Sequence, residues 1–200
     1  AQTIISGGFA TANFRATTID YPAGAAGSTS VFATYGAVLD PTAQATLDNT
    51  SVLTDDVLNT VMRFAGFFGV QNAGEVWTFA LPSDDGSAVD IQGTRVLNND
   101  GIHAFSGPST TVEFTTPGLY AINVLFFESQ PSEWGLEFRG GLNGATPNTA
   151  LTDRLYTLVD YANPNDDRLG SIGKVPEPSM LPLMGAALLG AFGFLRRKQR

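Results

Sequence analysis

An apolar run near the C-terminal end limits most strongly what this chain can fold into. From Met180 to Leu195 the sequence has no charged and no strongly polar side chain, and the basic stretch RRKQR follows directly. The run is slightly shorter than the ~20 residues that span a typical hydrocarbon core. Basic residues directly after such a run indicate that the C-terminus stays in the cytoplasm and that the preceding domain lies outside. We therefore expect one C-terminal transmembrane helix over residues 180–195, with a buried C-terminal helix as the alternative.

A proline-bracketed acid, Pro176-Glu177-Pro178, precedes this run. Paired prolines hold the backbone extended and outside any helix, and an extended segment suits recognition by a processing enzyme. The order VPEPS, apolar segment, basic end with Arg196 and Arg197 resembles the PEP-CTERM sorting signal of Gram-negative bacteria. The resemblance implies recognition by an exosortase, removal of the tail, and delivery to the cell surface or an exopolysaccharide-rich matrix. The alternative is a chance linker before an ordinary tail anchor.

The residues ahead of the tail suffice for a single domain. About 170 residues can bury a substantial core, and the sequence shows no internal repeat of solenoid or propeller length. The polar, turn-rich stretch NPNDDRLGSIGK (163–174) is typical of a linker. We expect a domain with its linker over residues 1–172 and the sorting signal over residues 173–200.

Charge excludes one class of partner. The formal net charge is -8, whereas proteins that bind nucleic acid present basic patches to the phosphates. The chain has no cysteine, so its stability comes from a core or from bound ions and not from disulfides. The sequence begins with AQT and without a charged and apolar leader, which fits a chain trimmed after a signal peptide. Export is therefore an expectation.

Short segments of strand-like composition dominate the middle of the chain. They are rich in β-branched and aromatic residues, several alternate apolar with polar, and Gly, Pro, Asp or Asn separates them. This pattern predicts an all-β fold, an antiparallel sandwich or barrel. Residues 30–39 are interpreted as a further strand, and residues 54–70 as a capped helical turn before a strand. The five clearest strands are VWTFAL (76–81), SAVDIQG (87–93), TTVEFTT (110–116), LYAINVLFFE (119–128) and WGLEFRG (134–140).

The order of these elements over residues 74–138 resembles the PA-fourteen domain, a β-sandwich named for anthrax protective antigen. A Gly-then-Phe strand, a Ser-Asp-Asp-Gly-Ser turn, an Ile-x-Gly strand, an Asn-Asp-Gly-x-His loop, a Pro-Gly-x-Tyr turn and a strand ending in Phe-Glu follow one another. The resemblance implies an antiparallel β-sandwich ahead of the linker and the transmembrane helix. It implies less about function, because the fold occurs in glycosidases, adhesins and toxins.

The turn Ser83-Asp84-Asp85-Gly86 holds the strongest candidate for a binding site. Adjacent carboxylates repel each other unless a cation or several donors lie between them, and Ca²⁺ takes ~6–8 oxygen ligands. In the lectin branch of the PA-fourteen family, two such aspartates are joined by a cis peptide bond and bind Ca²⁺, which in turn binds sugar hydroxyls; the resemblance implies the same here. The alternative is a hairpin turn in which Asp84 caps backbone amides and Asp85 faces water.

A second loop, SQPSEW, is expected to complete the site, since two carboxylates leave most of a Ca²⁺ coordination sphere empty. In the lectin branch this loop supplies an asparagine side chain and backbone carbonyls, one of them from a tryptophan before a glycine. Trp134 before Gly135 matches that pair. The asparagine is absent; Gln130 lies nearest in position, and Glu128 or Glu133 is a further candidate ligand. Trp134 either stacks on a sugar ring or fills the core.

The other acidic pairs and the only histidine are interpreted as structural. Asp55 and Asp56 resemble a helix cap with a charged first turn, and the pair at 166–167 lies in the linker. His103 is expected to find a local hydrogen bond near the Asp84 loop and not to ligate, because Ca²⁺ prefers oxygen.

The sequence carries none of the nucleophile-elbow, zinc-protease or phosphate-loop motifs, and neighbouring aspartates cannot flank a glycosidic bond from opposite faces. We therefore predict a non-enzymatic protein of the surface or matrix of a Gram-negative bacterium, formed through an inner-membrane intermediate. Its partner is a glycan or exopolysaccharide, bound by Asp84, Asp85 and Trp134, with Ca²⁺ held by Asp84, Asp85, Gln130 and Trp134. One alternative is a structural matrix protein without a specific ligand; another is a glycosidase, which would need two acids from different strands to line a cleft.

Overall fold

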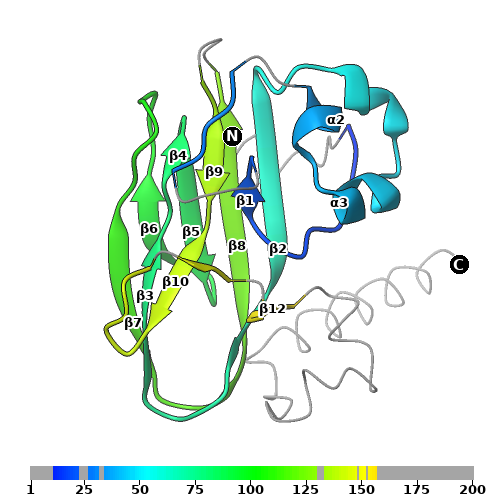
Figure 1. Ribbon diagram of the computed structural model, residues 1–200. Helices are drawn as coiled ribbons and strands as arrows, with labels where there is room; N and C mark the ends of the chain where they lie inside the picture. The colour runs from blue at the N-terminus through cyan, green and yellow to red at the C-terminus, as the bar shows by residue number, and fades with distance from the viewer. Residues whose placement is uncertain are drawn as a thin grey trace, which may run out of the picture.

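The computed structural model describes residues 11–22, 27–31, 34–129, 133–147, 149–151 and 153–156. Antiparallel β-strands dominate this part of the chain, and the short helices lie toward its N-terminal end (Figure 1). The all-β expectation is confirmed for the described residues. The helices are α2 (Tyr35–Val38), α3 (Pro41–Thr46) and the 3-10 helix η1 (Thr50–Thr54). The strands are β1 (Asp20–Tyr21), β2 (Thr60–Val70), β3 (Glu75–Ala80), β4 (Ser83–Asp84), β5 (Ser87–Ile91), β6 (Thr94–Asn99), β7 (Ser109–Phe114), β8 (Gly118–Glu128), β9 (Gly135–Glu137), β10 (Arg139–Leu142), β11 (Thr149–Ala150) and β12 (Leu155–Tyr156).

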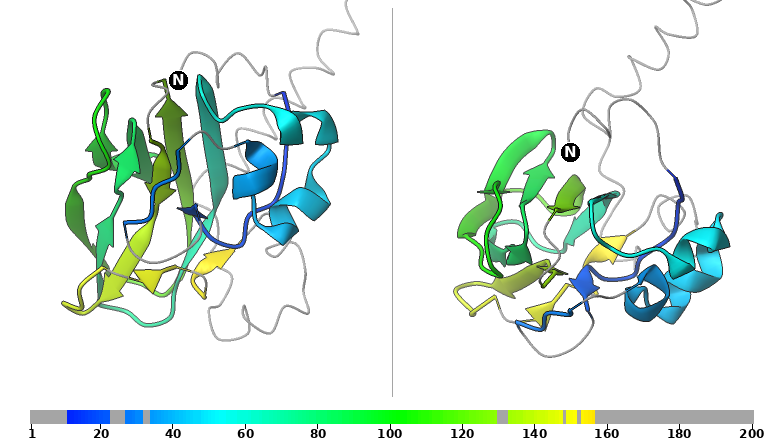
Figure 2. Two further views of the ribbon diagram at one scale, coloured as in Figure 1. Left: turned by 45° about the horizontal axis from the view of Figure 1, so that its top comes forward. Right: turned by 90° about the horizontal axis from the view of Figure 1, so that it is seen from above.

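Two sheets form the layers that enclose the core (Figure 2). One has the strand order β12-β2-β8-β5-β6, and the other β11-β10-β3-β7. Rings from both layers meet between them: Phe68 of β2 lies 5.0 Å from Trp77 and 5.1 Å from Phe79 of β3, measured between ring centroids. Phe68 and Phe79 are wholly excluded from solvent. A third, smaller sheet, β1-β9-β4, contains Asp84.

Strand β8 is the central element of the larger sheet. It pairs along its whole length with β2, from Gly118 opposite Val70 to Glu128 opposite Thr60, and its other edge pairs with β5. Side chains of a strand alternate between the two faces of a sheet, so every second residue of β8 points into the core. The strand expected at 119–128 is therefore confirmed, and it lies between two neighbours in its sheet.

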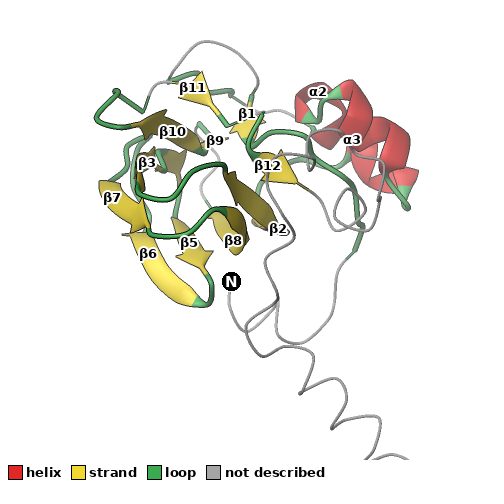
Figure 3. Ribbon diagram, turned by 90° about the horizontal axis from the view of Figure 1, so that it is seen from below, coloured by secondary structure: helices red, strands yellow, loops and turns green. Residues whose placement is uncertain are grey.

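The N-terminal third differs from the sequence-based expectation. Residues 30–39 do not form one strand: they contain an isolated bridge at Ser30 and helix α2. Helix α3 follows because the Asp40 carboxylate accepts hydrogen bonds from the backbone N–H groups of Thr42 and Ala43 at its N-terminus, and Pro41 occupies its first turn. The sequence Asp-Pro at 40–41 is the signal for this helix. Figure 3 shows both helices on one side of the sheets.

Two further boundaries were wrong. Asp55 is the C-cap of the 3-10 helix η1 and Asp56 forms a bridge with Thr34, so this pair does not open a helix. The expected strand at 134–140 is divided into β9 and β10, which pair in different sheets. Strand β6, which sequence reasoning did not assign, continues the sheet beyond β5.

Within the described residues, no helix has the length and apolar character needed to cross a membrane. The expected helix at 180–195 and the sorting residues Pro176, Glu177, Pro178, Arg196 and Arg197 lie outside the described residues.

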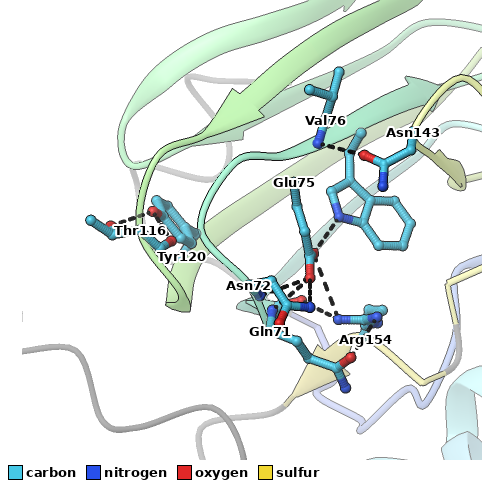
Figure 4. Close-up of polar contacts among 10 residues, drawn as sticks. Gln71, Asn72, Glu75, Val76, Thr116, Tyr120, Asn143 and Arg154 are labelled. Atoms are coloured by element: carbon cyan, nitrogen blue, oxygen red, sulfur yellow. Dashed lines mark hydrogen bonds and ion pairs between the residues drawn. The ribbon is translucent and has the colours of Figure 1, made fainter.

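A buried carboxylate joins β3 to the segment before β12. Glu75 accepts hydrogen bonds from the backbone N–H groups of Gln71 and Asn72 and from the Trp77 indole, and its Oε2 lies 3.8 Å from Nη1 of Arg154 (Figure 4). Burial alone would raise the pKa of Glu75. The hydrogen bonds from Trp77 and Asn72 and the Arg154 guanidinium outweigh burial, so its pKa lies below the ordinary value of 4.5.

We expect Glu75→Gln to lower the free energy of unfolding at pH 7 by about 1–3 kcal/mol, because the amide leaves a buried donor facing other donors. A lowered folded pKa contributes stability that is present above pH 4.5 and is lost as the pH falls through the folded pKa. The difference between wild type and variant should therefore shrink in urea denaturation at pH 3. The exposed Glu113→Gln variant is the control, and an equal loss in both variants would contradict the role of Glu75.

Candidate functional site

The turn that carries the two aspartates joins β4 to β5. The peptide bond between Asp84 and Asp85 is cis, as the resemblance to the lectin branch implies. Position 86 requires a glycine, because a Cβ there would lie 2.2 Å from the Phe127 ring, closer than two carbon atoms can approach. The Gly86 carbonyl also accepts a hydrogen bond from the backbone N–H of Phe127. The turn is thus seated directly against the end of β8.

Three carboxylates converge at this turn. Ligand oxygens of Asp84, Asp85 and Glu128 all lie within 4.8 Å of one another, and the three residues are only 4%, 1% and 2% exposed. Glu128 reaches the turn because β5 and β8 pair with Ser87 opposite Phe126, so the residues that follow along β8 lie beside those that precede β5. Sequence reasoning named Glu128 only as a substitute ligand, and the structure places it in the cluster.

The Asp85 carboxylate is held by hydrogen bonds from two loops. Its Oδ1 accepts the backbone N–H of His103 at 3.1 Å, and its Oδ2 accepts the backbone N–H and the hydroxyl of Ser129 at 3.0 and 2.9 Å. Three donors compensate much of the loss of hydration of a buried carboxylate. Neither donor residue was predicted to hold Asp85, because two of the donors are backbone N–H groups, which carry no sequence signal, and Ser129 is far from Asp85 along the chain.

Asp84 is less well compensated. Burial raises the pKa of Asp84 and the neighbouring Asp85 carboxylate adds to the rise, whereas the nearby His103 side chain opposes it. Unit charges 4.8 Å apart repel each other by roughly 3.5 kcal/mol at an effective dielectric constant of ~20. A cation among the three carboxylates would remove this repulsion and satisfy their oxygens, so the cluster could bind a metal ion.

The second loop lies partly within the described residues. Trp134 is 3% exposed and belongs to the main core. Of the two expected roles of its ring, this position fits packing in the core and not stacking on a sugar. Its backbone pairs with Ser30, whose N–H donates to the Trp134 carbonyl at 3.0 Å. A carbonyl has two lone pairs, so this oxygen stays a predicted ligand. Gln130 lies outside the described residues, and Glu133 is exposed.

His103 lies beside the cluster, as expected. Its Nδ1 is 3.0 Å from the Ala104 carbonyl oxygen and its Nε2 is 3.1 Å from that of Asn99. The expectation of a local hydrogen bond is confirmed, and the backbone N–H of His103 also donates to Asp85.

A groove of the described domain lies away from the three clustered carboxylates. Its volume is about 940 Å³, and it runs along β2 beside the N-terminal segment and the helices, with Phe14, Tyr35 and Phe64 in its wall. The residues that line it do not include the three clustered carboxylates. The candidate metal ligands therefore lie away from this groove, at the end of the sheets where β4 and the C-terminal end of β8 are found (Figure 1, top).

Comparisons with known proteins found similarities for the C-terminal tail and for the β-strand domain. Residues 174–198 match the family model of the PEP-CTERM protein-sorting motif. No curated protein matches the chain. Among solved structures, the chain is similar to the PA14 domain of the MpAFP antifreeze protein, with 20% identity, a TM-score of 0.59 and coverage of 78% of this chain and 80% of that one. It is also similar to a PA14 sugar-binding domain from an RTX adhesin, with 16% identity, a TM-score of 0.61 and coverage of 78% and 84%.

These likenesses show that the domain has the PA14 fold, and the expected resemblance to PA-fourteen domains is confirmed. The tail carries a PEP-CTERM sorting signal, as expected. Such a signal indicates an exported protein that an exosortase processes and that reaches the cell surface or the matrix.

We expect Asp84→Asn to raise the unfolding temperature of the full chain in the presence of chelator at neutral pH, because the amide removes one of three clustered charges. A gain of about 1 kcal/mol corresponds to roughly 2–4 °C in a domain of this size. Asp56→Asn, which neutralises an exposed aspartate outside the cluster, should leave the temperature within about 1 °C. A lower unfolding temperature for Asp84→Asn would show that donors already compensate the cluster fully.

Proposed function

We propose that the chain is an exported protein of the cell surface or matrix that binds carbohydrate through a Ca²⁺ ion held by Asp84, Asp85 and Glu128. The observation that carries the proposal is the convergence of three buried carboxylates within 4.8 Å. An isolated structural turn needs no third carboxylate from a different strand. Oxygen-only ligands favour a hard cation, and Ca²⁺ accepts the irregular geometry that loops provide. The backbone carbonyl of Trp134 and the side chain of Gln130 are proposed as further ligands.

The bound ion would supply coordination positions for sugar hydroxyls, since Ca²⁺ takes ~6–8 oxygens and three carboxylates do not fill them. The fold supports this ligand class, because one structural neighbour is a sugar-binding PA14 domain of an adhesin. Two exposed apolar side chains also adjoin the site along the chain. Ile102, 62% exposed, precedes His103, and Val31, 53% exposed, follows Ser30. Such side chains can cover the C–H face of a sugar ring.

The proposal assigns the chain no catalytic role. Asp84 and Asp85 share one turn, and Glu128 lies within 4.8 Å of them, so the three carboxylates converge on one point. A glycosidase places two carboxyl groups on opposite sides of a bond, ~5 Å or more apart. The alternative, a structural matrix protein without a ligand, draws support from Asp85, whose oxygens already accept three hydrogen bonds.

We expect Ca²⁺ to raise the unfolding temperature of the full chain. A ligand present at a hundred times its Kd stabilises the folded state by about 2.7 kcal/mol, which corresponds to roughly 5–10 °C here. The rise should vanish in Asp84→Ala/Asp85→Ala and persist in Asp55→Asn/Asp56→Asn, a matched pair of exposed aspartates. Glycan-array binding should depend on Ca²⁺ in the same way. A wild-type chain that does not respond to Ca²⁺ would favour the structural alternative.

We also propose that residues 173–200 act as a unit that is separate from the domain of residues 1–172, with the apolar segment 180–195 in the inner membrane before processing. In a host with an exosortase, Pro176→Ala/Pro178→Ala should leave the chain unprocessed and membrane-associated, measured as a larger species in the membrane fraction. Asp166→Asn/Asp167→Asn, in the linker, should be processed normally. Normal processing of the proline variant would show that the enzyme does not read this motif.

A further inference from the structure

One loop contacts Asp85 and the strand that carries Asp84. In the loop from Asn99 to Ser106, here called the cap loop, the backbone N–H of His103 donates to Oδ1 of Asp85 at 3.1 Å. At the end of the loop, Ser106 forms a bridge with Ser83, the residue before Asp84. A movement of this segment would therefore move the donor to Asp85 relative to the strand that holds Asp84.

The cap loop is closed at its base by one side chain. The amide nitrogen of Asn99 donates to the Ser106 carbonyl at 2.7 Å, which joins the two ends of the loop, and to the Ser83 hydroxyl at 3.0 Å. Ser83 and Ser106 also exchange backbone hydrogen bonds of 3.0 and 3.1 Å. Ser83 directly precedes Asp84 in β4, so Asn99 links the loop that supplies the donor to Asp85 with the strand that holds Asp84.

The ring of His103 strengthens the same closure. Its Nε2 lies 3.1 Å from the Asn99 carbonyl oxygen, so both the side chain and the backbone of Asn99 hold the loop. An asparagine amide has two donor hydrogens, and in this structure both have acceptors, Ser106 and Ser83. No other type of side chain of this size offers two donors from one atom.

We infer that Asn99 is a positioning residue of the metal site: its amide holds the cap loop against Ser83, so that the N–H of His103 orients Asp85 beside Asp84. The inference rests on the proposed function, since it concerns the same cluster. Groups that orient metal ligands change metal affinity by about 10–100-fold when they are removed. Asn99 does not itself touch the ion.

The test is the Ca²⁺ affinity of the full chain by isothermal titration calorimetry, for wild type and Asn99→Asp. The substitution keeps the shape and replaces the donor amide with an acceptor that faces the Ser106 carbonyl. Its added negative charge would by itself favour a cation, so weaker binding can come only from the lost donors. We expect Kd to rise about tenfold or more. Asn98→Asp, an exposed neighbour that adds the same charge on the other face of β6, should change Kd by less than about twofold.

A purely structural role would lower the unfolding temperature in chelator and leave Kd unchanged, and that result would overturn the inference. Amide hydrogen exchange at His103 should also be faster in Asn99→Asp, and unchanged protection would count equally against the inference. If Asn99→Asp does not fold, Asn99→Ser, which keeps one donor, replaces it, and its Kd should also rise.

A wild-type chain that does not bind Ca²⁺ would overturn the proposed function and this inference together. Binding that is equal in wild type and variant would overturn this inference alone.

Discussion

The pairing of β8 with β2 on one edge and β5 on the other is the constraint on which the rest of this domain depends. The pairing places the inward residues of three strands against the aromatic layer of β3 and β7, and Phe68 touches both of those strands. A one-residue slip in a strand would turn its core residues to the opposite face. The same register also brings Glu128 beside the Asp84–Asp85 turn, so one set of backbone hydrogen bonds determines both the core and the acidic cluster.

The acidic cluster combines two opposite electrostatic situations. Asp85 is surrounded by donors from His103 and Ser129, as a carboxylate in a rigid structural turn would be. Asp84 is buried beside a second negative charge, and its pKa is raised by burial and by that charge. A domain that needed only a turn would gain stability by replacing such a group with a neutral one. Ligand binding gives a physical reason for the arrangement, since a cation would compensate the charges that the protein itself leaves close together.

Particular elements show how far local sequence patterns reach. The alternation of apolar and polar residues predicted β3, β5 and β7, and the apolar segment LYAINVLFFE predicted β8. These predictions succeeded because the residues of a strand reflect which of its faces are buried. The interpretation of residues 30–39 as a strand was wrong because helix α2 covers Tyr35–Val38 without a local signal: its N-cap, Thr34, makes no side-chain cap hydrogen bond. Strand β6 was missed because its residues are largely exposed at a sheet edge and carry little apolar pattern.

Short stretches of sequence suffice to recognise the turn of the site, two adjacent aspartates before a glycine, and the sorting motif in the tail. Tertiary structure alone decided which third carboxylate joins them. Glu128 lies 43 positions after Asp85, and only the β5–β8 register brings the two together. The position of Trp134 in the core and the hydrogen bond from the backbone N–H of His103 to Asp85 also depend on the tertiary structure. Local chemistry is a property of neighbours along the chain, whereas the convergence of charges depends on contacts that folding makes between distant segments.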